Sequence, residues 1–302
     1  MIIPPEYFSL NNRDDLLEIY ESRTFDDTVL KSFTSDKHNI KIVENEIGRF
    51  IMFDETYQAG LIDTQFYKGN IPYINYFLLS LNFCPKPENI LLIGMGSGKL
   101  AADFNKYANC KRIDIVDVDP FMFEIAREYF GFKKQDNINL IISDGVEFVK
   151  ASPVKYDIII VDTAGNDGLL SEFCEIDFLK SLKNILTKKG ILMQNLFSSA
   201  DFASPYNLIL KSFAKTYMSV FKDVKLIKSS YSDEIFYQTF YGKKERLVDL
   251  VNAIFIASKS PLETVQTVKD FKNYANDVGE VDFEYKSGHV LTKEFFERFV
   301  LY

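Results

Sequence analysis

Asp117, Asp144 and Asp162 each stand at or just beyond the end of a run of apolar residues rich in Ile. Runs of this length are typical of the buried strands of a parallel sheet. Ligands of such sheets bind beyond the carboxyl ends of the strands, so we expect the three carboxylates to share one crevice. There a carboxylate can bind sugar hydroxyls, accept a hydrogen bond from a base or take a proton from a reacting group.

A glycine-rich loop, Gly-Met-Gly-Ser-Gly-Lys at 94–99, directly follows the first apolar run. Its glycines allow a sharp turn and a close approach to a ligand at a helix N-terminus. A phosphate-binding P-loop does not fit, because Ile93 and Leu100 stand where it needs Gly and Ser or Thr. A dinucleotide fingerprint is weakened by Lys99 in place of its third glycine. The remaining pattern, GxGxG, is typical of the S-adenosylmethionine-binding Rossmann-like fold. We predict that the loop binds a nucleoside through Gly94, Gly96, Ser97 and Gly98.

Asp117 lies 19 residues after Gly98, at the end of the second run, where a ribose diol would lie. We predict that Asp117 and its neighbour Val118 belong to the nucleoside site. The alternative is that Asp117 merely ends a strand. Asp119 is explained by helix capping, with Pro120 in the first turn and Gly131 ending the helix.

Asp144 and Gly145 follow the third run, where the acid could accept a hydrogen bond from an adenine amino group. The alternative is a capping box with Glu147, and both can hold. Asp162 ends the fourth run and is the candidate base. Its alternative is a solvated acid at a strand end.

The elements that must position these residues change character near Pro85 and Pro87. Before them the pattern predicts a small β-rich unit with strands over 38–43 and 48–54, then a helix over 66–82. After them, apolar runs alternate with amphipathic helices, one of which runs from about Phe173 to near Gly190. The runs are 90–93, 113–116, 138–142, 158–161 and 191–196, with a further strand at 253–257 and helices and loops beyond it. We therefore predict an α/β protein with a mostly parallel, doubly wound sheet at 86–302 and a β-rich domain at 1–85.

Composition narrows the class of protein further. Among 302 residues, 47% are hydrophobic, and 35 basic residues against 43 acidic ones give a net charge of -8, which argues against a nucleic-acid partner. No stretch approaches the ~20 apolar residues of a membrane span, and no targeting segment is visible. Three scattered cysteines and two histidines, His38 and His289, suggest neither disulfides nor a metal site. We expect a cytoplasmic protein without a bound metal.

Together these segments resemble the spermidine synthase family, the polyamine aminopropyltransferases, from about 38 to 262. The resemblance rests on 48–58, the glycine loop, 116–119, 143–145, 156–162 and 252–259. It implies a homodimer that transfers the aminopropyl group of decarboxylated S-adenosylmethionine, a co-substrate and not a permanent cofactor, to an amine. It also implies ribose at Asp117, adenine at Asp144, Asp162 as the acidic base and acceptor-side contacts at Gln58 and Tyr67. Gln58 is assigned to the donor site as well, and Thr163 to the acceptor site with Asp162.

The departures from the family pattern fall mostly on the acceptor side. Ser97 replaces a usual acid, and Met95 and Lys99 replace glycines. A Tyr-His-Glu motif is altered to Tyr67 followed by Lys68 and Gly69, and a second acid and a proline are missing after Asp162, at Gly165 and Asn166. Asp167 could substitute for that acid from a shifted loop. The chain thus resembles a divergent member of the spermidine synthase family, and its amine acceptor need not be putrescine.

Two other functions stay open on the sequence. Methyl transfer from S-adenosylmethionine itself would suit Ser97 in place of an acid, and would be favoured by Lys99 pointing into the pocket. A degenerate homologue without catalytic activity would explain the lost His-Glu pair and the lost second acid. The aromatic stretch 231–241 could cover the active-site mouth, although ordinary burial explains it as well.

Overall fold

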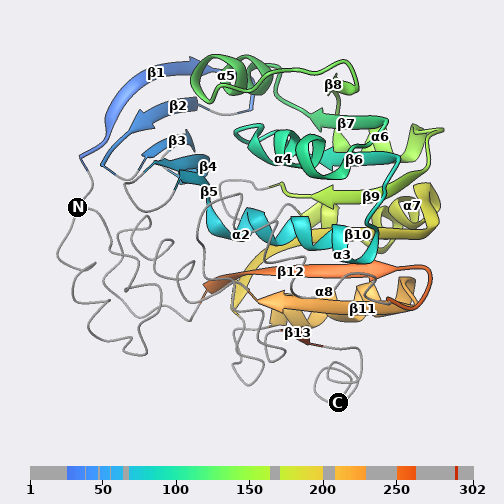
Figure 1. The fold of residues 1–302 in the computed structure, drawn as a ribbon. Coiled ribbons are helices and arrows are strands. Elements are labelled where there is room, and N and C mark those ends of the chain that lie inside the picture. The colour runs from blue at the N-terminus through green and yellow to red at the C-terminus, as the bar shows by residue number, and fades with distance from the viewer. Residues whose placement is uncertain are drawn as a thin grey trace.

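The computed structural model describes residues 26–37, 39–46, 48–54, 56–63, 68–163, 171–199, 208–228, 250–262 and 290–291. These residues form two sheets, one of five strands and one of eight. The five-stranded sheet lies beside the larger sheet, at the end toward which β7 and β9 point (Figure 1). His38, Tyr67, 164–170, 231–241 and His289 lie outside the described residues.

The five-stranded sheet is antiparallel, and its strands neighbour one another in chain order. Its strands are β1 (Thr28–Thr34), β2 (Asn39–Glu44), β3 (Gly48–Phe53), β4 (Thr56–Asp63) and β5 (Lys68–Asn70). The two predicted strands correspond to β2 and β3. Between them, Asn45 and Gly48 exchange backbone hydrogen bonds of 3.0 and 3.3 Å, which close the turn. β1, β4 and β5 were not predicted.

The predicted helix over 66–82 begins later than expected. Residues 68–70 form β5 instead, because they pair with the end of β4, where Leu61 lies opposite Asn70. The helical segment starts at α2 (Pro72–Asn75), with the proline in the first turn, and continues through η2 (Tyr76–Leu79) and α3 (Ser80–Phe83). It ends at Cys84, before the two prolines, as the sequence indicates.

The larger sheet has the order β13-β11-β12-β10-β9-β6-β7-β8. Its parallel part confirms all five predicted runs and contains β6 (Asn89–Ile93), β7 (Arg112–Asp117), β8 (Ile138–Ile142), β9 (Tyr156–Val161) and β10 (Leu186–Ser199). The predicted strand near the C-terminus is β12 (Leu250–Ser258), antiparallel to β10. β11 (Asp223–Lys228) and β13 (Val290–Leu291) complete the antiparallel edge and were not predicted.

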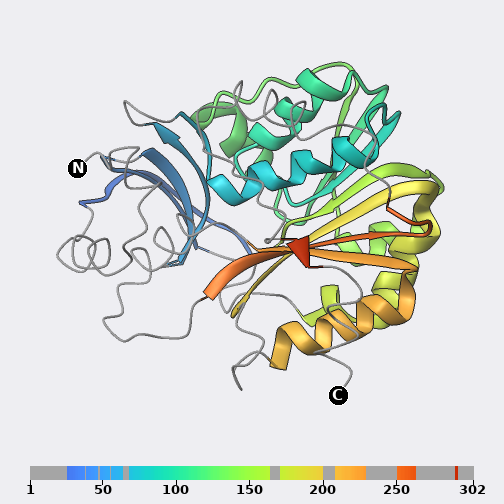
Figure 2. The ribbon, with the colours of Figure 1, turned by 60° about the horizontal axis from the view of Figure 1, so that its bottom comes forward.

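Helices cover both faces of this sheet, as a doubly wound fold requires (Figure 2). One face packs on α4 (Lys99–Ala108), α5 (Phe121–Tyr129) and the 72–83 segment. The other packs on α6 (Gly145–Ala151), α7 (Ile176–Ile185) and α8 (Leu208–Val220). Side chains alternate between the faces, so that Ile90 and Leu92 join the first core and Leu91 and Ile93 the second. The first core also contains residues of the five-stranded sheet, such as Ile40 and Phe50.

The helix predicted from Phe173 to near Gly190 is shorter than expected. Phe173 belongs to a separate 3-10 turn, η3 (Ser171–Cys174), and α7 ends at Ile185. The chain then turns at once into β10, whose first residue, Leu186, pairs with Tyr156. None of the helices in the described ranges is both long and apolar enough to cross a bilayer.

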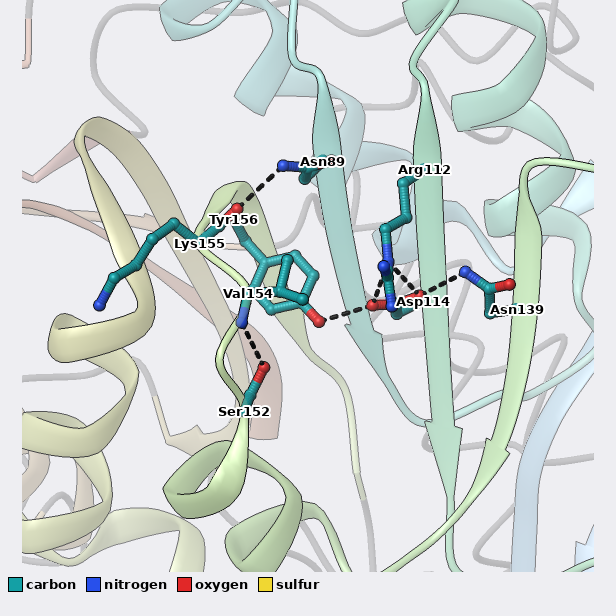
Figure 3. A network of polar contacts seen from close by, with 8 residues as sticks. All are labelled: Asn89, Arg112, Asp114, Asn139, Ser152, Val154, Lys155 and Tyr156. Carbon is teal, nitrogen blue, oxygen red and sulfur yellow. Dashed lines mark hydrogen bonds and ion pairs between the residues drawn. The ribbon is translucent and has the colours of Figure 1, made fainter.

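A buried polar network ties the amino-terminal ends of the parallel strands together (Figure 3). The side chain of Asp114, on β7, has no exposed surface, and it receives hydrogen bonds from three neighbours. Tyr156 Oη donates at 2.6 Å, Asn139 Nδ2 at 2.8 Å and Arg112 Nε at 2.8 and 2.9 Å. A buried carboxylate is costly unless it is paired and hydrogen-bonded, and Asp114 is both. The network lies at the end of the sheet away from the carboxyl ends and is structural.

Candidate active site

A cavity of about 360 Å³ opens at the carboxyl ends of the parallel strands, between them and β4. All eleven of the predicted site residues that the structure describes line it: Gln58, Gly94, Gly96, Ser97, Gly98, Asp117, Val118, Asp144, Gly145, Asp162 and Thr163. The structure thus brings these residues to one place. Tyr67 lies outside the described residues, so its contact with an acceptor stays a prediction.

The glycine loop needs its glycines for conformation and for space. Gly94, Gly96 and Gly98 have φ angles of 103°, 50° and 77°, in the left-handed region that favours glycine. A Cβ at Gly94 would lie 2.2 Å from the main-chain oxygen of Asp162. The loop is therefore packed directly against the end of β9. Gly98 then starts α4 as its N-cap residue.

Asp117 holds the loop in place as well as lining the cavity. One of its carboxylate oxygens accepts from Met95 N at 2.8 Å and the other from Asp119 N at 3.0 Å. Burial raises the pKa of Asp117 to about 6, although these backbone hydrogen bonds lower it. Val118, 45% exposed, presents an apolar side chain at the cavity wall. This pair offers a carboxylate beside an apolar surface, which suits a ribose and its base.

Asp119 and Asp144 both act as helix caps. Asp119 Oδ1 accepts from Phe121 N at 3.0 Å at the start of α5, and Gly131, with a φ of 68°, follows the end of that helix. Asp144 Oδ1 accepts from Val146 N at 2.8 Å and from Glu147 N at 3.0 Å. Both acids therefore accept main-chain hydrogen bonds at a helix start, as the capping interpretation predicts. The second half of the predicted capping box is not among the hydrogen bonds of the described residues, because the Glu147 carboxylate accepts from Lys150 Nζ at 2.8 Å. Asp144 also lines the cavity, so capping and base recognition remain compatible there.

Asp162 lies at the centre of the candidate site, just beyond β9. Tyr73 Oη donates to its Oδ2 at 3.2 Å and Asn195 Nδ2 to its Oδ1 at 3.1 Å. Burial raises the pKa of Asp162 to about 6, although both hydrogen bonds lower it. The carboxyl group is therefore ionised at neutral pH but takes up a proton far more readily than an exposed acid, as a general base must.

Three residues of this site were missed by the sequence reasoning. Tyr73 comes from α2, Asn195 from β10 and Asn252 from β12, and all three line the cavity. Asn195 Nδ2 also donates to Asn252 Oδ1 at 2.9 Å. The sequence does carry one signal for two of them: Asn195 lies within the apolar run 191–196, and Asn252 directly precedes the run 253–257. Buried amides of this kind need partners, and here the partner is the candidate base.

Lys99 does not point into the cavity. Its ammonium group pairs with Asp103 one turn along α4, and Lys99 is not among the residues that line the cavity. Burial raises the pKa of Asp103, while Lys99 and a 3.0 Å hydrogen bond from Asn70 stabilise its charged form. The feature that would have favoured methyl transfer is therefore not found. Among the described residues, no three His, Cys, Asp or Glu side chains cluster as metal ligands would.

Comparison with known proteins identifies a domain of a known family in this chain. Residues 77–225 match the spermine/spermidine synthase domain. By this match, the domain at 77–225 belongs to the spermidine synthase family. A polyamine aminopropyltransferase of Vibrio vulnificus is 31% identical over 153 residues, which are 50% of this chain and 49% of that protein. Another, from Methanocaldococcus jannaschii, is 29% identical over 160 residues, which are 51% and 53%.

The matched region spans about half the length of these curated relatives of the family. The fold agrees over more of the chain. A crystal structure of a probable spermidine synthase from Corynebacterium glutamicum superposes with a TM-score of 0.65 at 14% identity, covering 90% of this chain and 94% of that one. At this identity the likeness concerns the fold alone, and it confirms the predicted α/β architecture with its β-rich N-terminal part.

Proposed function

We propose that this protein is an aminopropyltransferase that moves the aminopropyl group of decarboxylated S-adenosylmethionine to an amine. The observation that carries the proposal is Asp162, a carboxyl group with a raised pKa in the same cavity as the glycine loop. Membership of the domain at 77–225 in the spermidine synthase family supports the reaction type. The contact between Gly94 and the main chain of Asp162 supports a reaction at the boundary between donor and acceptor.

Asp162 would act on the attacking amine. In water at neutral pH a primary amine is present mainly as its ammonium form, because the pKa of that form is ~10. The ammonium must lose a proton before its nitrogen can attack. The nitrogen lone pair forms a bond to the aminopropyl carbon next to the sulfonium, the C–S bond breaks, and its electron pair stays on sulfur as a neutral thioether. Asp162 accepts the amine proton, and Tyr73 and Asn195 hold its two oxygens in place.

The donor would lie along the other half of the cavity. Asp117 and Val118 offer a carboxylate and an apolar wall to the ribose and base, and Asp144 stands near the start of α6. The glycine loop allows a close approach of the main chain to the nucleoside. Gln58, from β4, closes the cavity from the side of the five-stranded sheet. In this arrangement the sulfonium would lie between Asp117 and Asp162.

The test is to incubate the purified protein with decarboxylated S-adenosylmethionine and a panel of primary amines and to quantify methylthioadenosine and the new amine. We expect product with at least one amine, and a loss of about 10²- to 10⁴-fold in kcat for Asp162→Asn, the range for removal of a general base. Asp157→Asn is the matched control, because Asp157 lies on the same strand at its other end and binds Glu88 N at 2.9 Å.

The control variant should lose stability and keep its turnover per folded molecule. Methylated product formed from S-adenosylmethionine, without aminopropyl product from its decarboxylated form, would contradict the proposal. So would an Asp162→Asn variant with unchanged kcat.

A further inference from the structure

A chain of side-chain amides runs from Asp162 across two neighbouring strands. Asn195, on β10, donates from the same Nδ2 to Asp162 Oδ1 at 3.1 Å and to Asn252 Oδ1 at 2.9 Å. Asn252 lies on the antiparallel strand β12, where it pairs with Phe197 of β10. All three side chains line the cavity, and Asn252 is 1% exposed. We call Asp162, Asn195 and Asn252 the amide chain.

The carboxylate fixes the direction of this chain. An ionised carboxylate only accepts hydrogen bonds, so Asn195 turns its NH₂ group toward Asp162. The second N–H of the same group then meets Asn252, which has to offer its carbonyl oxygen. Asn252 is left with its NH₂ group at the free end. The position two hydrogen bonds away from the base is therefore a hydrogen-bond donor.

Three polar atoms around the amide chain have no hydrogen-bond partner among the described residues: Asn252 Nδ2, Asn195 Oδ1 and Thr163 Oγ1. Leaving such an atom buried and unpaired costs about 1–3 kcal/mol. One nitrogen that donates, one oxygen that accepts and one hydroxyl that can do both remain close to Asp162. A hydroxyl or amide group of a ligand could satisfy them, because it both accepts and donates.

We propose that the amide chain determines the acceptor, selecting an amine whose second polar group is an uncharged hydroxyl or amide and not a second ammonium. The inference rests on the proposed aminopropyl transfer and names the substrate class of that same site. Asp162 takes the reacting amine, and the second polar group lies at Asn252. An ammonium group only donates, so it would face the NH₂ of Asn252 donor to donor. A hydroxyl oxygen there accepts from Asn252 and gives its proton to Asn195 Oδ1.

The experiment compares two acceptors of equal length, 4-aminobutan-1-ol and putrescine, with decarboxylated S-adenosylmethionine as donor. The two differ only in the second group, hydroxyl against ammonium. We expect kcat/KM of the unmodified protein to be about tenfold or more higher for the amino alcohol, since a site built for a hydrogen-bonding group discriminates strongly. Equal values, or a preference for putrescine, would overturn the inference.

Asn252→Asp is the variant that tests the mechanism. An aspartate can still accept from Asn195, so the amide chain persists, while the free end changes from a donor to a negatively charged acceptor. We expect the preference to reverse toward putrescine, by about tenfold or more. Asn184→Asp adds the same charge at an exposed position outside the cavity and should leave the preference unchanged.

The outcomes separate the inference from the proposed function. Aminopropyl transfer to other amines, with the diamine preferred over the amino alcohol or with neither accepted, would refute the selectivity and retain the reaction. Absence of aminopropyl transfer to every amine would refute both. A reversed preference in Asn252→Asp, together with an unchanged one in Asn184→Asp, would establish Asn252 as a specificity residue.

Discussion

Asp162 is costly to ionise where it stands, because its partners Tyr73 and Asn195 are neutral. Burial outweighs both hydrogen bonds and raises its pKa to about 6. The folded protein therefore holds a proton on Asp162 between pH 4 and 6, where the unfolded chain has lost it. The proposed role as a base requires the charged form at neutral pH, and that form costs the folded protein stability.

This cost gives a prediction for stability against pH. In the window from about pH 4 to 6 Asp162 binds more protons in the folded state than in the unfolded state, so its contribution to the free energy of unfolding falls as pH rises. Asp162 contributes up to about 3 kcal/mol to this fall, from its shift of about two pH units. Asp162→Asn should remove that contribution and be more stable than the parent at pH 7. Urea titrations of the parent and the variant from pH 4 to 8 measure it, and a difference in free energy of unfolding between the two that does not change with pH would contradict the prediction.

Asp117 offers a second prediction at the scale of one residue. Both its oxygens accept backbone hydrogen bonds, one of them from Met95 in the glycine loop. Asp117→Ala removes both acceptors, so we expect lower stability by about 1–3 kcal/mol and affinity for methylthioadenosine reduced about tenfold or more. Calorimetric titration and thermal melts give the two values. Asp177→Asn, at an exposed position on α7, is the control and should change neither.

At the scale of elements, the parallel strands were predictable because each is a continuous apolar run of strand length. The acids at their ends were predictable from their position in the run. β5 was not, since Lys68–Asn70 becomes a strand only by pairing with β4. Asn195 and Asn252 were also missed: nothing local marks two amides 57 positions apart as partners. In both cases the structure depends on pairing between segments that are distant in the chain, and a single sequence does not show which segments pair.

The network around Asp114 predicts a separation of stability from function. Tyr156→Phe removes the 2.6 Å hydrogen bond to Asp114 and leaves Arg112 and Asn139 in place. We expect the free energy of unfolding to fall by about 1–3 kcal/mol. Affinity for methylthioadenosine should not change, because the network lies at the opposite end of the strands (Figure 3).

Tyr107→Phe is the matched control for this variant. Tyr107 takes a hydrogen bond from the exposed Lys106, and its loss should cost less than about 0.5 kcal/mol. Urea unfolding of both variants provides the comparison. Equal costs for the two tyrosines would show that the Asp114 network does not stabilise the sheet.

At the scale of the whole molecule, the five-stranded sheet is anchored to α5 beside the cavity. Phe33 of β1 packs against Phe121 and Tyr129, with ring centroids 5.4 and 6.3 Å away. Arg49 of β3 donates to the main-chain oxygen of Tyr129 at 2.7 Å, near the end of the helix. Because β4 supplies Gln58 to the cavity, this anchor sets how closely the sheet covers the site.

Loosening the anchor should therefore affect binding from a distance. Phe33→Ala removes both ring contacts, and we expect faster amide hydrogen exchange in β1–β3 and weaker binding of methylthioadenosine, by about threefold to tenfold. Val29→Ala, on the same strand with a side chain 54% exposed, is the control and should leave both unchanged. Faster exchange with unaltered affinity would show that the sheet does not contribute to binding.

Because Gly94 has no Cβ, the glycine loop packs directly against the main chain of Asp162, and this contact matters for any redesign of the protein. A Cβ there would lie 2.2 Å from the main chain of Asp162, so a substitution in the donor loop is also a displacement of the base. A mutant library that includes Gly94 would therefore alter the position of the proposed base together with the proposed donor site. A library at 252 leaves the glycine loop unchanged, whereas one at 195 removes a hydrogen bond of 3.1 Å to Asp162. Asn252, which does not contact Asp162 directly, is therefore the position in the proposed acceptor site where variation disturbs the proposed base least.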